Sequence, residues 1–547
     1  MRRAAAILFC CCAAVAAFFR YQIADGFTRL FSDSYDGMLE LALLDHWDNV
    51  LRGFSPWSEP LFFFPNKGVL GYNDGYLLYG LIYSLFRAFA IDPLLSGELV
   101  NLAVRAIGFL SGYAAARRIL ELPMTLSLLA ATLFTVSNGA YVAMDHAQML
   151  SVGFAPLLAL PLHRAFRALI EGDRRGLAIG GSLFLLGCAA WLMTAFYAAW
   201  FFLLLVLAFS IAWLALAPAA ERRRMQVALP REAPVLALLA GLAVLVDLPF
   251  LSLYLPKAVE TGMRSYHEVS TFLPTPLDLV NVGDSNLLWG RAYGAFRRFI
   301  GAPPPAWLTL ASGFPPATLS LFLAAAVWLW RSREPDARLR RLRALMAATL
   351  ATWALVLQIG TVSAYPLIYY LVPGAKAIRV VVRYQLLLAV PVIGLGCAFL
   401  ASRFGKAPVV LLAAVSAVLV AEQFNHLAVR QIDRPAQLAR LGAVPPPPAG
   451  CGAFYVARTA QEAQGLADAV YRHSVDAMLL AELNHLPTVN GVDSFAPPGY
   501  DLYRPGEPSY RDRVRLYAER NNVHALCGLD MRSNRWQLPD QTEGLQP

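Results

Sequence analysis

AAAILFCCCAAVAAFFR (residues 4–20) is soon followed by FSDSYDGMLE (residues 31–40), and this combination of an apolar segment and an acidic motif decides how the chain is interpreted. Asp33 and Asp36 lie three residues apart, where the chain has just left the apolar segment. Unpaired carboxylates beside a bilayer are costly, so their presence there needs a reason. Either a solvated loop supplies a helix cap at Ser32 or Asp33, or an active site lies at the outer membrane surface.

The composition is that of a membrane protein. Of the 547 residues, 57% are hydrophobic and only 15% are charged, and the mean hydropathy is +0.49. Repeated apolar runs of about 17–22 residues have the length that a membrane-spanning helix needs, which predicts a polytopic α-helical protein. The net charge of +9 is explained by arginines that fix the orientation of such helices on the cytoplasmic side. We therefore expect no nucleic-acid partner.

The arginine clusters predict an N-terminus in the cytoplasm and about eleven spans. The apolar run 76–92 is expected to be an interfacial or re-entrant helix, because counting it as a span would place Arg117 and Arg118 outside. The spans predicted on this basis are 4–20, 98–116, 124–142, 149–166, 177–195, 198–217, 234–255, 307–330, 346–361, 384–402 and 407–424. The C-terminal part of the chain then lies outside the cytoplasm.

The sequence predicts two domains. Residues 1–429 form a transmembrane domain with a first outer loop at 21–75 and a long outer loop at 256–306, and residues 430–547 form a soluble extracytoplasmic domain. The proline run 445–448 is typical of a stiff linker. The second domain is expected to be a small α/β unit. Its short strands are predicted near 451–457 and 523–527, and its helices at 461–484 and 508–521.

Cys451 and Cys527 are the only cysteines in the predicted soluble domain. In an oxidising compartment, two cysteines on neighbouring strands can form a disulfide. A pair of buried free thiols is the alternative, and the sequence leaves both open.

Several chemistries are absent from the sequence. It contains no phosphate-binding G-x-x-x-x-G-K, no G-x-S-x-G and no H-E-x-x-H motif. The eight histidines are scattered, which argues against a zinc site. What remains is a set of charged residues on the predicted outer side: Asp33, Asp36, Glu40, Asp145, His146, Arg379 and Arg383.

The segment VPGAKAIRVVVRY (residues 372–384) places three cations on the outer side, against the rule that the other clusters obey. This indicates either an error in the topology or a binding site. Arg379 and Arg383 are four residues apart, so on a helix they would share a face. Two guanidinium groups at the membrane boundary suit a phosphate or pyrophosphate group. Arg105, in the middle of a predicted span, is expected to have an interior partner or to line a cavity.

Four motifs together resemble a known family. They are the acidic motif with Trp47, Gly53, Pro56-Trp57 and FPNKG (64–68) behind it, DHAQ (145–148), IRVVVRY (378–384) and NGVDSFAPP (490–498). In this order and topology the sequence resembles the GT-C-type membrane glycosyltransferases, nearest to the YfhO-like and protein-mannosyltransferase-like bacterial members. It departs from that pattern at Val492-Asp493, where a Tyr-Ser pair is usual.

The resemblance implies a polyprenyl-phosphate-sugar donor and a glycan, lipid or protein acceptor on the outer face of a bacterial cytoplasmic membrane. Asp33 would act as the general base in an inverting transfer, with Asp36 as its backup or partner. Arg379 and Arg383 would stabilise the departing lipid phosphate. Glu40, Asp145, His146, Gln148 and Lys376 are the other residues expected to bind substrate. A divalent cation is used in some branches of the family, and the sequence does not decide whether one is bound here.

A function of another class fits the same sequence. A lipid-linked-sugar transporter or a scaffold for assembling envelope polymers would also be a polytopic membrane protein. A transporter should carry ionisable residues through the depth of several spans, whereas Arg105 and Asp247 are the main ones here. This scarcity favours a site at the membrane surface.

Overall fold

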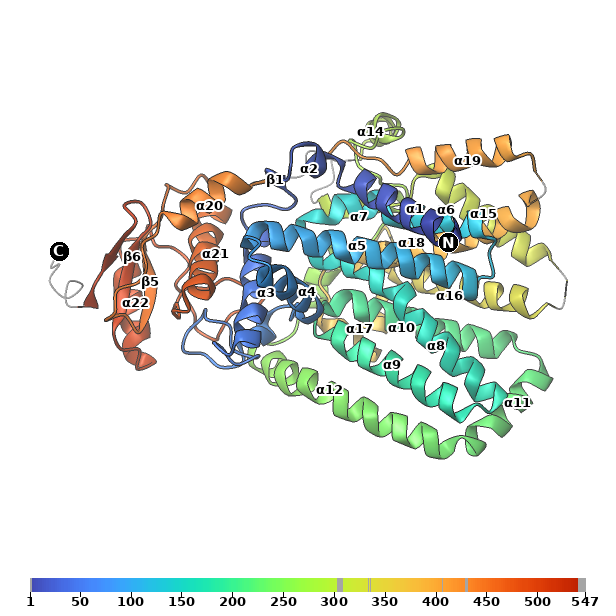
Figure 1. Cartoon of the computed structure of the whole chain (residues 1–547), viewed down its shortest axis with the longest axis horizontal. Coiled ribbons are helices and arrows are strands. Elements are labelled where there is room, and N and C mark those ends of the chain that lie inside the picture. The colour runs from blue at the N-terminus through green and yellow to red at the C-terminus, as the bar shows by residue number, and fades with distance from the viewer. Residues whose placement is uncertain are drawn as a thin grey trace.

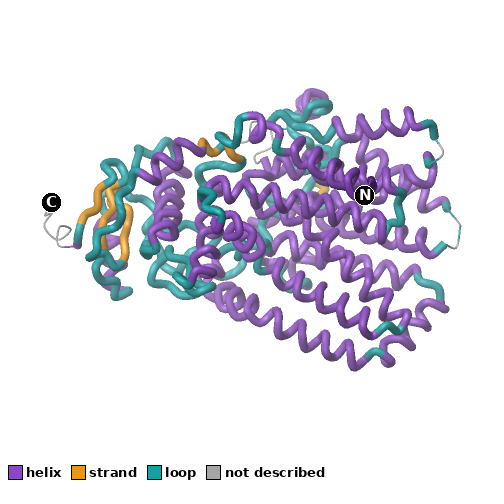
Figure 2. Tube along the Cα trace, viewed as in Figure 1, coloured by secondary structure: helices purple, strands orange, loops and turns teal. Residues whose placement is uncertain are grey.

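Most of the chain folds as long helices that lie side by side in a bundle, and a smaller mixed domain lies at one end of that bundle (Figures 1 and 2). In a bilayer each backbone polar group has to be satisfied within the protein, so long apolar runs fold as helices. The computed structural model describes residues 2–302, 308–332, 334, 336–405, 407–427 and 431–539. The predicted polytopic helical fold with a small C-terminal α/β domain is confirmed.

Seven helical segments of the described chain are long and apolar enough to cross a membrane. They are α5 (Pro93–Arg118), Met124–Asp145 with α6 (Met124–Thr135) and α7 (Asn138–Val142), Ala147–Glu171 with α8 (Phe154–Glu171), α9 (Arg174–Leu192), α10 (Phe196–Leu216), α12 (Ala233–Thr261) and Val381–Phe404 with α18 (Tyr384–Phe404). Further helices lie in the same bundle (Figure 1): α1 (Arg2–Phe18), α15 (Pro316–Arg331), α16 (Ala337–Val356) and α19 (Val409–Ala421). The count of eleven spans stays a prediction.

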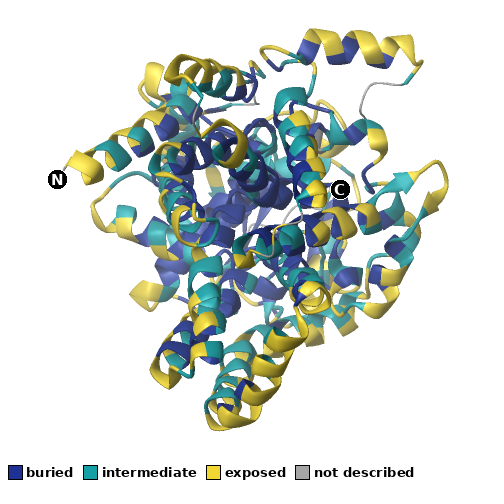
Figure 3. Cartoon of the chain, turned by 90° about the vertical axis from the view of Figure 1, so that its right-hand side faces the viewer, coloured by how far each residue is buried: buried dark blue, intermediate teal, exposed yellow. Residues whose placement is uncertain are grey.

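Apolar side chains cover the outside of the bundle as well as its centre. Viewed along the bundle, buried residues gather in the middle and exposed residues lie around them (Figure 3). On α12, Leu238 is 75% exposed and Val259 is 86% exposed. Lipid tails are as apolar as leucine, so such side chains suit a bilayer and not water. The exposed apolar surface agrees with a membrane-embedded bundle.

Three predicted boundaries are wrong. The span expected at 346–361 is a helix from Ala337 to Val356, because the Asp336 side chain accepts hydrogen bonds from the N–H groups of Arg338 and Leu339 and caps it nine residues earlier. The short hairpin of β2 (Gln358–Ile359) and β3 (Val362–Ser363) follows. The span expected at 307–330 begins at Pro316, with proline in the first helical turn. Helix α12 continues to Thr261, which shortens the outer loop expected from 256. Residues 303–307 and 430, at two other predicted boundaries, lie outside the described residues.

Helix α4 (Leu77–Ala88) occupies the ambiguous apolar run 76–92. It has 12 residues, fewer than the roughly 17–25 that a span requires. The helix packs on α3 (Asp36–Arg52), and Gly80 faces the Trp47 side chain so closely that a Cβ atom there would clash. Its length agrees with the interfacial or re-entrant helix that the sequence predicts.

Arginine-rich segments lie at the end of the bundle away from the small domain. Helix α11 (Ala219–Arg231), which carries three consecutive arginines, is at this end (Figure 1). Two arginines of α16 form ion pairs with Glu221 and Glu121, which join three segments there. This distribution agrees with the positive-inside pattern, while the orientation in the membrane stays a prediction.

Arg105 has the interior partners that its position in a span requires. The side chain is 1% exposed and donates hydrogen bonds to the carbonyl oxygens of Phe134, at 2.6 Å, and Thr135. Helix α6 ends at Thr135, so these carbonyls have no partner in a next helical turn. The guanidinium also lies 4.8 Å from the centre of the Phe18 ring. Arg105 therefore caps a broken helix inside the bundle, and the prediction is confirmed.

The C-terminal domain contains a three-stranded sheet in the order β5-β6-β7. Strands β5 (Ala453–Arg458) and β6 (Leu526–Asp530) are parallel, and β7 (Arg535–Gln537) is antiparallel to β6. Helices α20 (Arg434–Gly442), α21 (Leu466–Asn484) and α22 (Tyr510–Arg520) accompany the sheet. Cys451 and Cys527 form a disulfide with their Cα atoms 5.6 Å apart, because they stand on adjacent strand segments. Of the two alternatives that the sequence left open, the disulfide is the one that forms.

The first outer loop and the C-terminal domain are joined by backbone hydrogen bonds. Strand β1 (Arg29–Leu30) pairs with β4 (Ile432–Asp433), and the N–H of Phe63 donates to the carbonyl of Asn490 at 3.2 Å. The buried Glu482 of α21 accepts hydrogen bonds from the Leu61 N–H at 2.7 Å and the Asn49 side chain at 2.8 Å. These contacts hold the small domain against α3 and the segments on both sides of it.

Candidate active site

The acidic motif forms the entry to helix α3. Asp33 Oδ1 accepts hydrogen bonds from the backbone N–H groups of Tyr35, at 2.9 Å, and Asp36, at 2.8 Å. A Cβ atom at Gly37 would lie 2.7 Å from Ser32 Oγ, so the tight turn here requires glycine. Asp36 stands in the first helical turn, where a carboxylate is favoured by the helix dipole. Asp33 therefore stabilises the turn that leads into α3, and its predicted catalytic role stays a prediction.

Asp36 faces His146 from the second outer connection. His146 lies between the short 3-10 helices Ala143–Asp145 and Ala147–Gly153, and its Nε2 atom is 3.3 Å from Asp36 Oδ2. Burial and the nearby Asp33 raise the pKa of Asp36 to about 6, against the opposing effect of Arg383 and Arg379. Burial and the same arginines lower the pKa of His146 well below its usual 6.5. At neutral pH a neutral imidazole therefore stands beside a mostly ionised carboxylate.

Arg379 and Arg383 both act on Asp36, but they do not share a helix face as predicted. Helix α18 begins at Tyr384, after Val380 has left helical geometry, so Arg379 lies in the preceding segment. The backbone N–H of Arg379 donates to the Tyr197 hydroxyl at 2.7 Å. Its guanidinium lies 3.9 Å from Glu268 Oε1. Both arginines therefore lie in the non-α-helical segment that leads into α18, and their guanidinium groups are close enough to Asp36 to affect its pKa.

Two further carboxylates of the site were not predicted. Asp74 Oδ1 accepts a hydrogen bond from the Phe196 N–H at 2.7 Å, and burial raises the pKa of Asp74 to about 6 although this bond and Arg383 oppose it. Burial, with Asp74 and Asp36 adding to it, raises the pKa of Asp493 well above its usual value. Asp493 comes from the C-terminal domain, within the quoted motif 490–498.

We call these six residues the charged cluster: Asp36, Asp74, His146, Arg379, Arg383 and Asp493. They come from the first and second outer connections, the segment before α18 and the C-terminal domain. No local sequence pattern signals Asp74, because only tertiary folding brings it to the others. The cluster combines proton-accepting carboxylates with two guanidinium cations in a partly buried setting.

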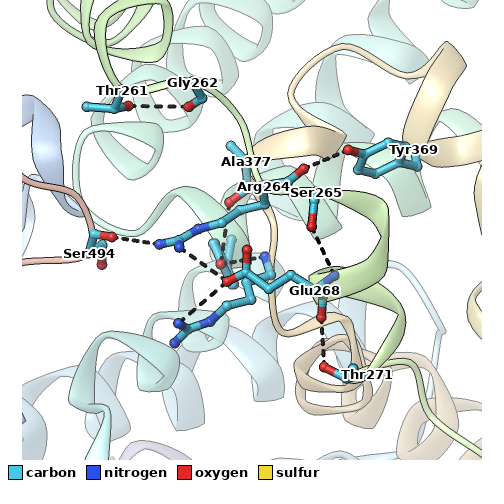
Figure 4. Close-up of polar contacts among 11 residues, drawn as sticks. Thr261, Gly262, Arg264, Ser265, Glu268, Thr271, Tyr369, Ala377 and Ser494 are labelled. Atoms are coloured by element: carbon cyan, nitrogen blue, oxygen red, sulfur yellow. Dashed lines mark hydrogen bonds and ion pairs between the residues drawn. The ribbon is translucent and has the colours of Figure 1, made fainter. Parts of the chain in front are cut away.

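The long outer loop also contributes to the site, through Arg264 and Glu268 (Figure 4). The Arg264 guanidinium donates to Glu268 Oε1 of α13 (Tyr266–Ser270) at 3.2 Å and to the Ser494 carbonyl at 2.6 Å. Its backbone N–H donates to the Lys376 carbonyl at 3.1 Å. Arg264 therefore ties the outer loop, the C-terminal domain and the arginine-bearing segment together around the cluster.

The structure places the other predicted residues around the cluster. Glu40 is buried, accepts a hydrogen bond from the Tyr76 hydroxyl at 2.9 Å, and has a pKa raised well above its usual value by burial. Gln148 is 8% exposed. The Asp145 backbone carbonyl accepts a hydrogen bond from Ser32 Oγ at 3.2 Å. Lys376 Nζ lies 5.4 Å from the centre of the Tyr370 ring.

Among the described residues, the side chains do not form a metal site. Within the described parts of the chain, no group of three or more His, Cys, Asp or Glu residues is placed to hold a metal ion. Asp36 and His146 are close enough to act as two ligands, but structural and catalytic metal sites generally use three or more protein ligands.

No protein-family model matches the chain, and no curated protein sequence matches it. Among solved structures, it is similar to the arabinofuranosyltransferase AftD from Mycobacteria, with 15% identity, a TM-score of 0.47 and 90% of this chain covered. It is also similar to the oligosaccharyltransferase of Archaeoglobus fulgidus in the apo form, with 13% identity, a TM-score of 0.49 and 95% of this chain covered. The chain spans 32% of the length of the first protein and 69% of the second. Both of these proteins are named as sugar-transferring enzymes.

Proposed function

We propose that the chain is a GT-C-type membrane glycosyltransferase that moves a sugar from a polyprenyl-phosphate donor to an acceptor. The observation that carries the proposal is the charged cluster, in which Asp36 lies 3.3 Å from His146 and close enough to Arg379 and Arg383 for both to affect its pKa. A base and two phosphate-binding cations are the groups that this transfer requires.

We assign the role of general base to Asp36, with Asp33 positioning it. Asp33 Oδ1 already accepts two backbone hydrogen bonds at the start of α3. A general base works best with a pKa near the working pH, and the pKa of Asp36 is raised to about 6. The Nε2 atom of His146 lies 3.3 Å from Asp36 Oδ2, so the neutral imidazole stands beside that oxygen of the carboxylate. Oδ1 is then the atom assigned to the acceptor proton.

The proposed reaction is a single in-line displacement. The acceptor hydroxyl attacks the anomeric carbon as its proton passes to Asp36, and the bond from that carbon to the phosphate oxygen breaks. The electron pair leaves with the lipid phosphate, whose negative charge grows in the transition state. Arg379 and Arg383 stabilise that charge more than they stabilise the uncleaved donor, which is the condition for catalysis. Attack from the face opposite the leaving group inverts the anomeric configuration.

The proposed location is a bacterial cytoplasmic membrane, with the N-terminus in the cytoplasm and the charged cluster on the outer face. The arginine-rich end of the bundle, opposite the C-terminal domain, supports this orientation (Figure 1). Alkaline phosphatase fused after Gly442 is expected to be active in cells. A fluorescent green fluorescent protein fusion at the same residue, with an inactive phosphatase fusion, would reverse the orientation.

The catalytic proposal is tested with purified full-length protein in nanodiscs. A panel of polyprenyl-phosphate monosaccharides is supplied, and release of polyprenyl phosphate is followed by mass spectrometry. We expect turnover by the wild type, its near loss in Asp36→Asn, and weakened donor use in Arg379→Ala and Arg383→Ala. Glu59→Gln is the control, because Glu59 pairs with Lys67 on the surface of the same outer loop.

An equal rate in Asp36→Asn and wild type would contradict the proposed chemistry. For transport, the protein is placed in liposomes instead of nanodiscs. Movement of the lipid-linked sugar across the liposome membrane, without cleavage of its sugar–phosphate bond, would favour the transporter. A scaffold would be favoured if the protein showed no cleavage and no transport, and if cells with Asp36→Asn still assembled envelope polymers normally.

A further inference from the structure

An open cavity of about 440 Å³ lies in the C-terminal domain next to the charged cluster. Its walls come from α21, from the segment with Asp493 and from residues 501–513. The volume is within the roughly 300–1,000 Å³ that is typical of small-molecule sites in proteins. Nothing in the catalytic proposal above uses this cavity.

Two residues connect the cavity with the charged cluster. Asp493 belongs to the cluster and also lines the cavity. Tyr471 lines the cavity, and its ring lies edge-on at 6.4 Å from the ring of Tyr35, the residue before Asp36. A molecule in the cavity would therefore extend toward the base that removes the acceptor proton.

Both arginines of the cavity lining are already paired with carboxylates. Arg504 donates to Glu507 Oε1 at 3.1 Å, and Arg513 donates to Glu507 Oε2 at 2.8 Å. The Arg513 Nε atom also lies 3.7 Å from Asp501 Oδ2. Three carboxylates, those of Asp493, Asp501 and Glu507, stand against these two arginines. A phosphate in the cavity would compete with carboxylates that already hold both guanidiniums.

The same lining suits a neutral ligand with many hydroxyl groups. Tyr471 and Tyr503 present flat rings that combine apolar faces with a polar hydroxyl, and these suit the apolar face of a sugar ring. Carboxylates accept hydrogen bonds from hydroxyl groups, and the paired guanidiniums donate through their remaining N–H groups. Asp501 is 72% exposed, so its carboxylate is available to a ligand without a large desolvation cost.

We infer that this cavity binds neutral sugar residues of a glycan acceptor, and that it presents an acceptor hydroxyl to Asp36. The inference rests on the proposed glycosyl transfer and narrows its acceptor from glycan, lipid or protein to a glycan. The donor and acceptor then approach Asp36 from different sides, the lipid phosphate from Arg379 and Arg383 and the glycan from the C-terminal domain.

Binding is measured directly with the full-length protein in detergent, by saturation-transfer NMR and calorimetry. The probes are soluble neutral tri- to hexasaccharides of arabinose, mannose, galactose and glucose, with inorganic phosphate and a Ser/Thr-containing peptide as competing ligand classes. We expect at least one oligosaccharide to bind, with at least tenfold weaker binding in Tyr503→Ala and Asp501→Asn. Tyr503→Phe is expected to keep most of the affinity, because it keeps the ring.

Glu519→Gln is the matched control on the same domain, because Glu519 is an exposed residue of α22 away from the cavity lining. Melting curves check that the cavity variants fold. Binding that is unchanged in Tyr503→Ala and Asp501→Asn, or no oligosaccharide binding at all, would overturn the inference. Tighter binding of phosphate or of the peptide at this cavity would overturn it in favour of that ligand.

The two proposals fail in different ways. Asp36→Asn is expected to bind the oligosaccharide normally, since Asp36 does not line the cavity. Oligosaccharide binding without any donor cleavage by the wild type would refute the transfer and leave the sugar site standing. Donor cleavage and transfer that are indifferent to Tyr503→Ala would refute only the acceptor site.

Discussion

Replacing Asp36 with asparagine is the most direct test of the charged cluster. Asparagine keeps the size of the side chain and its contact with His146, but it accepts no proton from an acceptor. A general base typically contributes about 10²–10⁴-fold, so the transfer rate is expected to fall by that factor while donor binding remains. Asp33→Asn is expected to cost less, because in our assignment Asp33 positions the base.

The pH dependence follows from the raised pKa of Asp36. With a pKa of about 6, about nine-tenths of the carboxylate is ionised at pH 7 and about one-tenth at pH 5. The wild-type rate is therefore expected to rise about tenfold between pH 5 and pH 7 and then to level off. Asp36→Asn should lose this rise along with most of its activity.

Stability should change in the opposite direction. The pKa of Asp36 is raised in the folded protein from the usual 3.8 to about 6, so ionisation above pH 6 costs folding free energy, and protonation below pH 4 removes that cost. The difference corresponds to at most about 3 kcal/mol. Since the side chain is 40% exposed, solvent screening reduces this to about 1 kcal/mol. Asp36→Asn is expected to melt at a slightly higher temperature than wild type at pH 8.

The assay is single-turnover release of polyprenyl phosphate from pH 4.5 to 8.5, with Glu59→Gln as the surface control. A wild-type profile that is flat between pH 5 and pH 7 would refute the assigned role of Asp36. So would an Asp36→Asn variant within about tenfold of wild type beside an inactive Asp33→Asn, because the two aspartates would then have exchanged roles.

Three further predictions concern other parts of the protein. Arg383→Ala should reduce kcat/KM for the donor by about 10–100-fold, as expected for the loss of a charge-assisted contact of about 1.5–3 kcal/mol. Arg403→Ala, at the other end of α18, should leave kcat/KM unchanged. Equal effects of the two substitutions would exclude a phosphate-binding role for Arg383. Glu40→Gln should cost less activity than Asp36→Asn, since burial raises the pKa of the Glu40 carboxyl well above its usual value and so disfavours its charged form. A loss as large as that of Asp36→Asn would show that the charge of Glu40 is used. Cys451→Ser should lower the free energy of unfolding of the C-terminal domain, because the bond to Cys527 closes a loop with a sequence separation of 76 residues. Chain entropy gives this closure a stabilisation of about 4.5 kcal/mol. An unchanged melting temperature would contradict this prediction.

Much of the fold was predictable because apolar runs and arginine clusters are local signals. One apolar run was enough to predict the span that contains Arg105, and the charge of Arg105 within that run predicted an interior partner. Helix ends were harder to predict. The start of α16 depends on Asp336, whose capping hydrogen bonds outweigh the polarity of the arginines that follow it. The predicted start at residue 346 placed both Asp336 and the arginines after it outside the helix.

The charged cluster was predictable only in part. Asp36, His146, Arg379 and Arg383 were found because acidic and basic groups stood out against an apolar background. Asp74 was missed because its partner, the Phe196 N–H, is 122 residues away in the sequence. Its hydrogen bond, its burial and its place beside Arg383 all come from tertiary contacts. No periodicity or motif in the first outer loop carries that information.

The hydrogen bonds between the first outer loop and the C-terminal domain have a consequence for synthesis of the protein. Asn49 and Glu482 are 433 residues apart, and a ribosome that adds about 5–20 residues per second needs about 20–90 s to make that stretch. During this time the nascent chain holds Asp36 and His146 without Asp493 and without the docked domain. A chain whose translation stops before residue 490 lacks Asp493 and the docked domain, so the charged cluster is completed only late in biogenesis.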